Sequence, residues 1–442
     1  MTDIAADSFS ITSSDARARN ARALDSSRLR ARYGAEKRFR VYGAAAIVFG
    51  LVFLAWLFGS LVIQGTGAFR QTQIRVAVEL DAGELGLSGT PDREALEKAE
   101  YQAALRASLR KTLGVGSDRG ERRDAYALLS NGADLEIRSR VLADPSLVGK
   151  TINLWLTAGA DVDTMLKGNI SRDVPENKRR VNNRQIAWLD KLAADGRVGR
   201  HFNANLFTKG ASSDAELAGM GVAIVGSLYM MVVVLLVALP IGVAAAVYLE
   251  EFAPRNRWTD VIEVNINNLA AVPSIVFGLL GLAIFLNVFG MPRSAPVVGG
   301  LVLALMTLPV VIIATRAAIK AVPPSIREAA LGVGASRMQV ITHHVLPLAM
   351  PGILTGTIIG MARALGETAP LLLVGMVAFV VSQPATPFDP ATALPVQIYM
   401  WAGASERAFV ERTSAAILIL LAFLITMNAT AVILRRKFER RW

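Results

Sequence analysis

The stretch AVPPSIREAALGVGASRMQVITHHVLPLAMPG, residues 321–352, connects two long apolar segments but is itself too polar to remain in a membrane. Pro323 and Pro324 are expected to end the apolar segment before them. Ser325, followed three residues later by Glu328, is a capping-box pattern that predicts the start of a short helix. The stretch is therefore expected to be structured and not a flexible linker.

A second helix is predicted directly after the first. Gly332 and Gly334 are expected to end the first helix, and Ser336 with Gln339 repeats the capping pattern. A helix, a turn and a second capped helix form a rigid unit, which can transmit force to the apolar segments on both sides. The sequence therefore predicts a coupling element that docks onto another protein.

Several segments of the chain are apolar over about the 20 residues that a bilayer requires. Their ranges are 41–63, 218–248, 264–289, 296–316, 350–380 and 414–434. The first lies about 40 residues into the chain and is too long for a cleavable signal peptide. We expect an all-α polytopic membrane protein with six transmembrane helices, which places both ends of the chain on one side.

The basic residues indicate which side that is. Lys and Arg are concentrated in the tails 1–40 and 435–442. Short segments expected on the same side carry Arg255, Arg257, Lys320, Arg327 and Arg337, whereas those on the other side carry only Arg293, Arg407 and Arg412. Because Lys and Arg in short loops favour the cytoplasmic side, both tails are expected to be cytoplasmic.

The composition argues against several functions. Hydrophobic residues make up 53% of the 442 residues, which fits burial in lipid. The net charge of +11 comes from residues beside the apolar segments, without interleaved aromatics, so nucleic acid binding is not expected. The chain has no cysteine and only three histidines, so we expect no thiolate chemistry, no metal site and no bound cofactor.

Residues 64–217 differ from the rest because they are rich in charge and in turn signals. Every second residue from Ile74 to Leu80 is a large apolar one, which is typical of a strand with one buried face. Residues 92–111 have the spacing of an amphipathic helix. We expect an α+β domain outside the membrane.

Three of the apolar segments contain residues that interrupt helices. The pairs are Pro240 with Gly242, Pro273 with Ser274, and Gly366 with Pro370. Backbone groups freed by proline cannot be satisfied by lipid, so such breaks are tolerated where they face protein or a water-filled cavity. They indicate either a pathway among the second, third and fifth segments or simple helix kinks.

The coupling stretch resembles the EAA loop of bacterial ABC importer permeases, which couples the permease to its ATPase. The matching residues are Glu328, Ala329, Ala330, Gly334, Leu346 and Pro347. One position departs, because His344 stands where the family usually has an aliphatic residue two positions before the Leu-Pro pair. The resemblance implies a six-helix permease of the MetI-like type.

The neighbouring segments are more specific. They read ALPIGVAAAVYLEEFAP at 238–254, NNLAAVPSIVFGLLGLAIF at 267–285 and GILTGTIIGMARALGETAPLLLVGM at 352–376. These look like the corresponding spans of phosphate-import permeases of the PstA and PstC type, and GETAPLL favours phosphate over molybdate or sulfate. The resemblance covers the first span and residues 218–434. It places the chain among PstA-type proteins, but it does not explain the long region 64–217.

The sequence patterns and the resemblance together predict a division of the chain into five parts. These are a cytoplasmic basic tail 1–40, a transmembrane helix 41–63, an extracytoplasmic domain 64–217, a permease core 218–434 with the coupling loop 320–347, and a second tail 435–442. The implied partners are a homologous PstC-type permease, a cytoplasmic PstB-type ATPase dimer that uses ATP, a periplasmic PstS-type phosphate-binding protein, and lipid of the bacterial inner membrane. The chain itself would not be an enzyme.

Two charged residues stand inside the fifth apolar segment. Arg363 and Glu367 are four residues apart and so share a helix face. Ionisable groups at membrane depth are costly and are usually paired or functional. Either the two form a salt bridge that only neutralises charge, or Arg363 offers donors to a passing oxyanion while Glu367 moderates its affinity.

Further pathway candidates are Arg316, Ser274 and Thr368. Arg316 lies one helical turn after Ile313, at whose position the family commonly has an arginine, so it is either a displaced pathway charge or a boundary residue that reaches the headgroups. The two hydroxyls either donate hydrogen bonds at the helix breaks or only pack helices together.

The expected function is that of a permease subunit of an ATP-driven phosphate importer. Two alternatives remain open. One is a permease for another oxyanion, such as molybdate or sulfate. The other is a membrane-anchored phosphate sensor, in which residues 64–217 bind a ligand and the loop signals to a cytoplasmic partner.

Overall fold

The structure is a computed structural model that describes residues 26–87 and 92–438. The arginines before residue 26, together with Arg440 and Arg441, were assigned to the cytoplasmic tails. They lie outside the residues that the structure describes. The chain divides into two units, residues 1–61 and 62–442. In the first unit the described residues belong to one continuous helix, α2 (Ser26–Gly65), which is long and apolar enough to cross a membrane.

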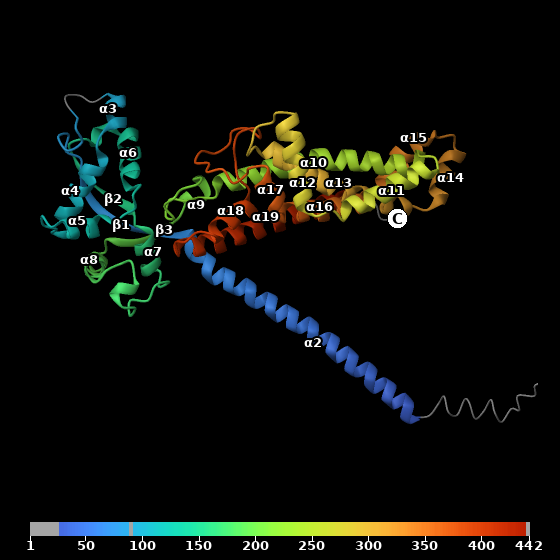
Figure 1. Ribbon diagram of the computed structural model, residues 1–442, viewed down its shortest axis with the longest axis horizontal. Coiled ribbons are helices and arrows are strands. Elements are labelled where there is room, and N and C mark those ends of the chain that lie inside the picture. The colour runs from blue at the N-terminus through green and yellow to red at the C-terminus, as the bar shows by residue number, and fades with distance from the viewer. Residues whose placement is uncertain (1–25, 88–91, 439–442) are drawn as a thin grey trace, which may run out of the picture. The chain divides into compact units, whose positions relative to one another are not determined.

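The second unit begins with an α+β domain built around an antiparallel sheet (Figure 1). Its strands are β1 (Arg70–Glu79), β2 (Thr151–Thr157) and β3 (Val198–Phe202), in the order β2-β1-β3. The helices of the domain are α3 (Arg93–Lys98), α4 (Tyr101–Leu113), α5 (Arg119–Tyr126), α6 (Ala133–Ala143), α7 (Ala160–Leu166) and α8 (Asn183–Ala194). A sheet covered by helices is what the charged insert was expected to form.

The core of this domain lies against one face of β1. Ile74, Val76 and Val78 are at most 1% exposed and belong to one cluster with Leu105 of α4 and Ile137 of α6. The alternation that predicted the strand is confirmed, because residues two apart point to the same face of a sheet.

The single helix expected over residues 92–111 is wrong. The chain leaves helical geometry at Ala99, whose ψ of 151° is extended, and α3 and α4 are separate helices. The turn allows the hydroxyl of Tyr101 to donate to the carbonyl of Leu96 at 2.8 Å, and both side chains are buried. Tertiary packing therefore outweighs the local helical pattern.

The rest of the second unit is helical. The helices long and apolar enough to cross a membrane, besides α2, run over Gly221–Phe252, Pro296–Lys320, Arg337–Gly366 and Ala408–Lys437. They contain α10 (Gly221–Val247) with the π-helix η4 (Tyr248–Phe252), α13 (Pro296–Lys320), α15 (Arg337–Val340) with η6 (Ile341–Val345) and α16 (Leu346–Gly366), and α19 (Ala408–Phe438). The described residues thus offer five spans of this kind.

A sixth span was expected over residues 264–289, and here the helix is sharply bent. α11 (Arg257–Ala270) and α12 (Ser274–Gly281), which continues as η5 (Leu282–Val288), meet at an angle of 102°. The break falls at Ala271–Pro273, where the sequence had predicted an interruption. The bent pair is either a broken span or a re-entrant loop.

The other two expected interruptions have different outcomes. α16 ends at Gly366, before the short α17 (Ala369–Leu373), so the apolar segment 350–380 is not one continuous helix. Pro370 explains the end, since proline disfavours helical geometry in the residue before it and lacks a backbone donor. Pro240, in contrast, lies inside the continuous helix α10, so the break expected there is wrong.

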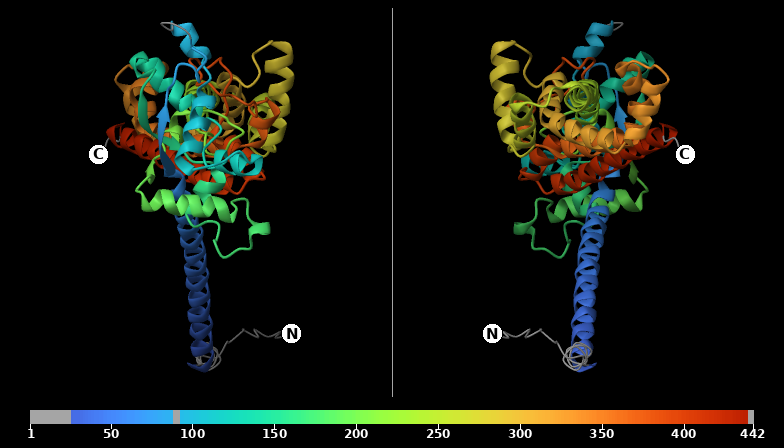
Figure 2. Two further views of the ribbon diagram at one scale, coloured as in Figure 1. Left: turned by 90° about the vertical axis from the view of Figure 1, so that its left-hand side faces the viewer. Right: turned by 90° about the vertical axis from the view of Figure 1, so that its right-hand side faces the viewer.

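Small residues allow α10, α13 and α16 to approach closely. A Cβ at Gly242 would meet Val311 at 2.7 Å, and one at Gly352 would meet Ala318 at 2.6 Å. Closely packed small residues are a common basis of helix association in membranes, where lipid offers no hydrophobic drive. The right-hand view of Figure 2 shows α10, in yellow-green, almost along its axis.

Candidate functional site

The coupling stretch folds as two short helices at one end of the helical bundle (Figure 1). The first, α14 (Pro324–Gly332), begins two residues earlier than a Ser325 cap predicts, with Pro323 in the N-cap position and no side-chain cap. The capping role predicted for Ser325 is therefore wrong. Proline is well suited to the first helical position, because the N–H it lacks has no partner there.

The second capping prediction is confirmed. The backbone N–H of Gln339 donates to the Ser336 hydroxyl at 3.3 Å, and the N–H of Ser336 donates to the Gln339 side chain at 2.8 Å. The turn before this cap passes through Gly334, whose φ of +89° is the left-handed geometry that glycine adopts without strain. The two helices are thus joined by a well-defined turn.

α14 has one face on the protein and one face free. Ala330 is 6% exposed and packs in a cluster with Ile319 and Val322 at the end of α13. Glu328 and Ala329 are exposed, and so are the large apolar side chains of the same stretch, Leu331, Val333 and Met338. An exposed face that combines a carboxylate, a small residue and apolar side chains is suited to docking against a partner protein.

The remaining matched residues lie where this unit joins α16. Leu346 and Pro347 are the first residues of α16 and are partly buried. His344, the residue that departs from the family pattern, is exposed in η6. The coupling stretch therefore continues into the long helix through η6.

Arg327 holds the inner face of α14. Its Nε and Nη2 donate to Oε1 of Glu251 at 3.1 and 2.9 Å. The same guanidinium donates to the backbone carbonyl of Val322 at 2.7 Å and to that of Ile319 at 2.9 Å. One side chain thus connects the coupling helix with the end of α13 and with η4, the continuation of α10.

Arg316 is paired on two sides. Its Nη2 lies 2.6 Å from Oε1 of Glu263 on α11, and its Nε lies 3.4 Å from Oε2 of Glu250 on η4. Lys320 also lies 3.4 Å from Glu250. Arg316 stands four residues before the end of α13 that leads into the coupling stretch, so its ion pairs connect three helices close to that stretch.

Arg363 and Glu367 remain neighbours across the end of α16. The Arg363 Nε lies 3.8 Å from Oε1 of Glu367, a loose pair, and the Arg363 side chain is 46% exposed in this single chain. Along a helix that rises 1.5 Å per residue, Arg363 is about 25 Å from Leu346. The structure therefore separates the Arg363–Glu367 pair from the coupling stretch.

The two hydroxyl candidates lie beside the same helix breaks. Ser274 is the first residue of α12 and follows the break at Pro273. Thr368 precedes α17, and its side chain does not cap that helix. Gly278 of α12 packs against α17, because a Cβ there would meet the Pro370 backbone at 2.7 Å. Ser274 thus begins α12, while Glu367 and Thr368 form the link between α16 and α17, the short helix that packs against α12.

Sequence reasoning missed Glu250, Glu251 and Glu263 as functional candidates. Glu250 and Glu251 end the second apolar segment, and Glu263 lies just before the third. Acidic residues that flank apolar segments next to several arginines are a signal for such pairs. The partners could not be assigned, because Arg316 and Arg327 are 66 and 76 positions away.

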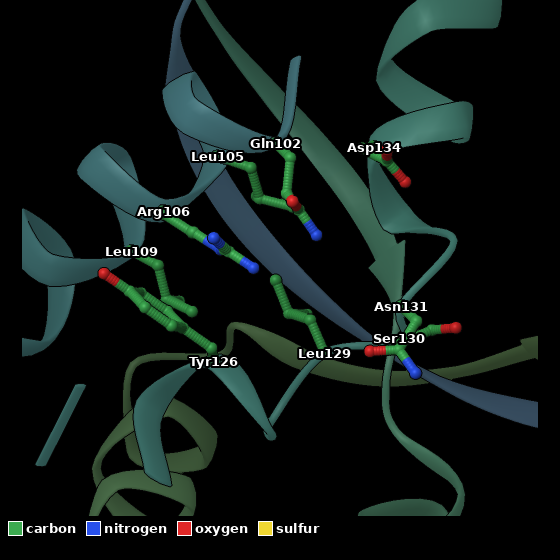
Figure 3. Close-up of a pocket in the computed structure, with 9 residues that line it drawn as sticks. All are labelled: Gln102, Leu105, Arg106, Leu109, Tyr126, Leu129, Ser130, Asn131 and Asp134. Atoms are coloured by element: carbon green, nitrogen blue, oxygen red, sulfur yellow. The ribbon is translucent and has the colours of Figure 1, made fainter. Parts of the chain in front are cut away.

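The α+β domain has its own small pocket of about 50 Å³ between α4, α5 and the start of α6 (Figure 3). Arg106, Tyr126 and Asn131 line it and also line an adjacent depression with Arg119, Arg122 and Arg123. The Arg106 guanidinium lies 5.2 Å from the centre of the Tyr126 ring, a cation–π contact. This surface of the domain is therefore strongly basic.

Glu136 of α6 is a partly buried carboxylate in this domain. It accepts hydrogen bonds from the backbone N–H of Thr157 at 3.3 Å and from the Thr157 hydroxyl at 2.5 Å. Burial raises the pKa of Glu136, and the hydrogen bonds and the nearby Lys209 offset only part of that effect. The carboxylate therefore holds a proton more readily than an exposed glutamate does.

Comparison with known families divides the chain in two. Residues 238–442 match the family described as binding-protein-dependent transport system inner membrane component. Residues 26–176 match a separate domain of unknown function, DUF3333. The second match ends inside the α+β domain, after α7 and before α8.

Several curated proteins are similar over about half of the chain. The phosphate transport system permease protein PstA 1 of Mycobacterium tuberculosis is 34% identical over 234 residues, 53% of this chain and 75% of that protein. The protein PstA of Pasteurella multocida is 33% identical, over 51% of this chain and 79% of its own length. The probable ABC transporter permease protein YqgI of Bacillus subtilis is 35% identical, over 42% and 68% respectively.

Among solved structures, a chain of the methionine ABC transporter MetNI in an inward-facing conformation is 17% identical. The match covers 50% of this chain and 98% of that chain, with a TM-score of 0.40.

Proposed function

We propose that this chain is a permease subunit of an ATP-driven inorganic phosphate importer. The premise is its family: the chain belongs to the family described as binding-protein-dependent transport system inner membrane component. Members of this family are integral inner-membrane permease subunits of ABC transporters and are not enzymes; ATP hydrolysis lies in a separate subunit. The family also implies a periplasmic binding protein as a partner.

The phosphate assignment is supported by the PstA permeases, which the chain matches over three quarters or more of their length. In this proposal the chain forms the translocation pathway together with a homologous PstC-type permease. A PstB-type ATPase dimer docks on the cytoplasmic side, and a PstS-type protein delivers the ion from the other side. Both ends of the chain are cytoplasmic.

The observation that carries the proposal is the exposed face of α14. Glu328 and Ala329 are available to a partner, while Ala330 is buried on the bundle. When the ATPase subunits close, they push on this face, and Arg327 transfers the displacement to Ile319, Val322 and Glu251. α13 and the end of α10 then move with the coupling helix.

The proposed path of the ion runs beside the break between α16 and α17. Arg363 offers guanidinium donors to the oxyanion, and Glu367, loosely paired at 3.8 Å, keeps the affinity low enough for release. Ser274 and Thr368 supply neutral donors near the same breaks. Arg316 is assigned a different role, because its two carboxylate partners leave its charge compensated near the coupling stretch.

Uptake by living cells tests this proposal. Cells that lack their own phosphate permeases would express the chain with its partner permease, ATPase and binding protein, and take up radiolabelled phosphate. We expect ATP-dependent uptake that excess unlabelled phosphate abolishes and excess molybdate or sulfate leaves unchanged. Inhibition by molybdate or sulfate instead would indicate another oxyanion, and no uptake together with an altered phosphate-starvation response would indicate a sensor.

A further inference from the structure

The α+β domain contacts the start of α19 through a buried group of charges. Nζ of Lys167, directly after α7, lies 2.7 Å from Oδ2 of Asp163 and 2.9 Å from Oε1 of Glu411 in the first turn of α19. The side chains of Lys167 and Glu411 are each 9% exposed. Figure 1 shows α7 beside the first turns of α19.

Each charge in this group has further partners. Oε2 of Glu411 accepts from the Asn169 amide at 3.1 Å, and Oδ1 of Asp163 accepts from the backbone N–H of Thr72 at 2.8 Å. Arg412, 6% exposed, donates to the carbonyl of Ala218. The buried carboxylate of Glu216 lines the same small cavity as these charges, so the group joins the domain, the segment before α10, and α19.

Close backbone packing surrounds the same contact. A Cβ at Gly67, between α2 and β1, would overlap the Glu411 carboxylate. A Cβ at Gly65 would meet the Ala415 backbone at 2.9 Å. The chain that enters the domain therefore runs directly against the first turns of α19, with no room for a larger side chain.

Charges this buried constrain geometry more than apolar contacts do. Replacing a buried ion pair by apolar residues is often neutral for stability, but removing one partner leaves an uncompensated buried charge and strongly destabilises the folded state. The group therefore favours the one arrangement of the domain and α19 in which every charge is paired.

We propose that Lys167 is a positioning residue that fixes the α+β domain on α19, so that a displacement of this domain during transport reaches the permease helices directly. This inference rests on the proposed function. α19 can pass the displacement on, because it packs along α16, and Arg435 near its end donates to the Thr355 hydroxyl of α16 at 3.1 Å. α16 carries Arg363, so the α+β domain and the proposed pathway are connected through packed helices.

The absence of cysteine makes a direct structural test possible. Two nitroxide labels would report the distance between the domain and the helical core by electron paramagnetic resonance. One is placed at Lys191→Cys in α8 and the other at Ser405→Cys, between α18 (Leu394–Ala402) and α19, and both positions are exposed. We expect a narrow distance distribution in the otherwise unchanged protein and a broad one in Lys167→Met. Lys98→Met, which removes only an exposed pair with Glu94, is the matched control and should leave the distribution narrow.

A functional readout separates positioning from plain stability. In the reconstituted complex, phosphate-loaded binding protein should stimulate ATP hydrolysis, and Lys167→Met should abolish that stimulation while basal hydrolysis stays unchanged. Lys167→Arg should restore it. Glu411→Met should also abolish the stimulation of ATP hydrolysis. The double variant Lys167→Met with Glu411→Met should lose no more stimulation than either single variant.

Two outcomes would overturn the proposal. A narrow distribution in Lys167→Met would mean that the charges do not fix the domain. A broad distribution with full stimulation would mean that fixing the domain has no part in transport. The distance measurement needs no substrate, so it remains decisive even if the complex transports something other than phosphate.

Discussion

Arg327 and Glu251 meet in a two-donor contact, with Nε and Nη2 of the arginine 3.1 and 2.9 Å from one carboxylate oxygen. Two carbonyls at the end of α13 accept from the same guanidinium. Arg327 is adjacent in sequence to Glu328, which points outward. The residue that faces the partner and the residue that holds the bundle are thus neighbours on one short helix.

Arg327→Gln should uncouple hydrolysis from transport. It removes a charge-assisted contact worth about 1.5–3 kcal/mol, so α14 loses its fixed position while its exposed face stays intact. We expect loss of phosphate uptake with ATP hydrolysis retained in the assembled complex. Arg257→Gln, at an exposed arginine of α11, is the control and should transport normally. Normal uptake by the Arg327 variant would show that the contact does not transmit force.

Ala329→Trp should prevent assembly with the ATPase. Ala329 is exposed on α14, so a large side chain there should be tolerated by the fold but should block close approach of a partner. We expect the variant to reach the membrane at normal levels and to lose co-purification of the ATPase. Ala402→Trp, at an exposed alanine of α18, is the control and should retain the ATPase. Retention of the ATPase by Ala329→Trp would place the docking face elsewhere.

Arg363→Gln should weaken the interaction with the ion. Loss of one charge-assisted contact corresponds to about a tenfold rise in the KM for phosphate uptake. Initial rates of uptake over a range of phosphate concentrations measure it, after the assembly of the complex has been checked. Unchanged kinetics would reduce Arg363 to a partner that neutralises Glu367.

Glu136 should make the stability of the protein depend on pH. Because burial raises the pKa of Glu136, the folded protein binds this proton more tightly than the unfolded chain. The free energy of unfolding therefore falls as the pH rises from the unfolded pKa through the folded one. Glu136→Gln removes this effect. The difference in free energy of unfolding between the variant and the unchanged protein should therefore favour the variant more at pH 8 than at pH 4.5.

The melting temperature of the full-length protein in detergent at these two pH values measures the difference. Glu94→Gln, at an exposed carboxyl, serves as the control. If the melting temperatures of Glu136→Gln and the unchanged protein differed by the same amount at both pH values, the raised pKa of Glu136 would be contradicted.

The local patterns of the sequence predicted much of the fold. The alternation over Ile74–Leu80 gave a buried strand face, Ser336 with Gln339 gave a true capping box, and Pro273 marked the sharp bend. In each case the determining interaction is between residues close in sequence or is an intrinsic property of one residue. The capping role predicted for Ser325 was wrong because Pro324 begins the helix, two positions before the start that a Ser325 cap implies.

The charged contacts of the site could not be predicted in this way. Lys167 and Glu411 are 244 positions apart, and Arg327 and Glu251 are 76 apart. Each side chain alone is compatible with a solvated surface, and only the fold brings its partner near. The turn between α3 and α4 was missed for a different reason: Tyr101 and Leu96 are only five positions apart, but both side chains are buried, and this packing outweighs a good helical pattern.

We propose that this chain conducts phosphate when a separate ATPase acts on its coupling stretch. The most direct test is the uptake of radiolabelled phosphate into proteoliposomes that contain the chain, its partner permease and the ATPase, with binding protein outside and ATP inside. We expect phosphate uptake that requires both ATP and binding protein. Phosphate entry at the same rate without ATP, or none under any condition in a fully assembled complex, would contradict it.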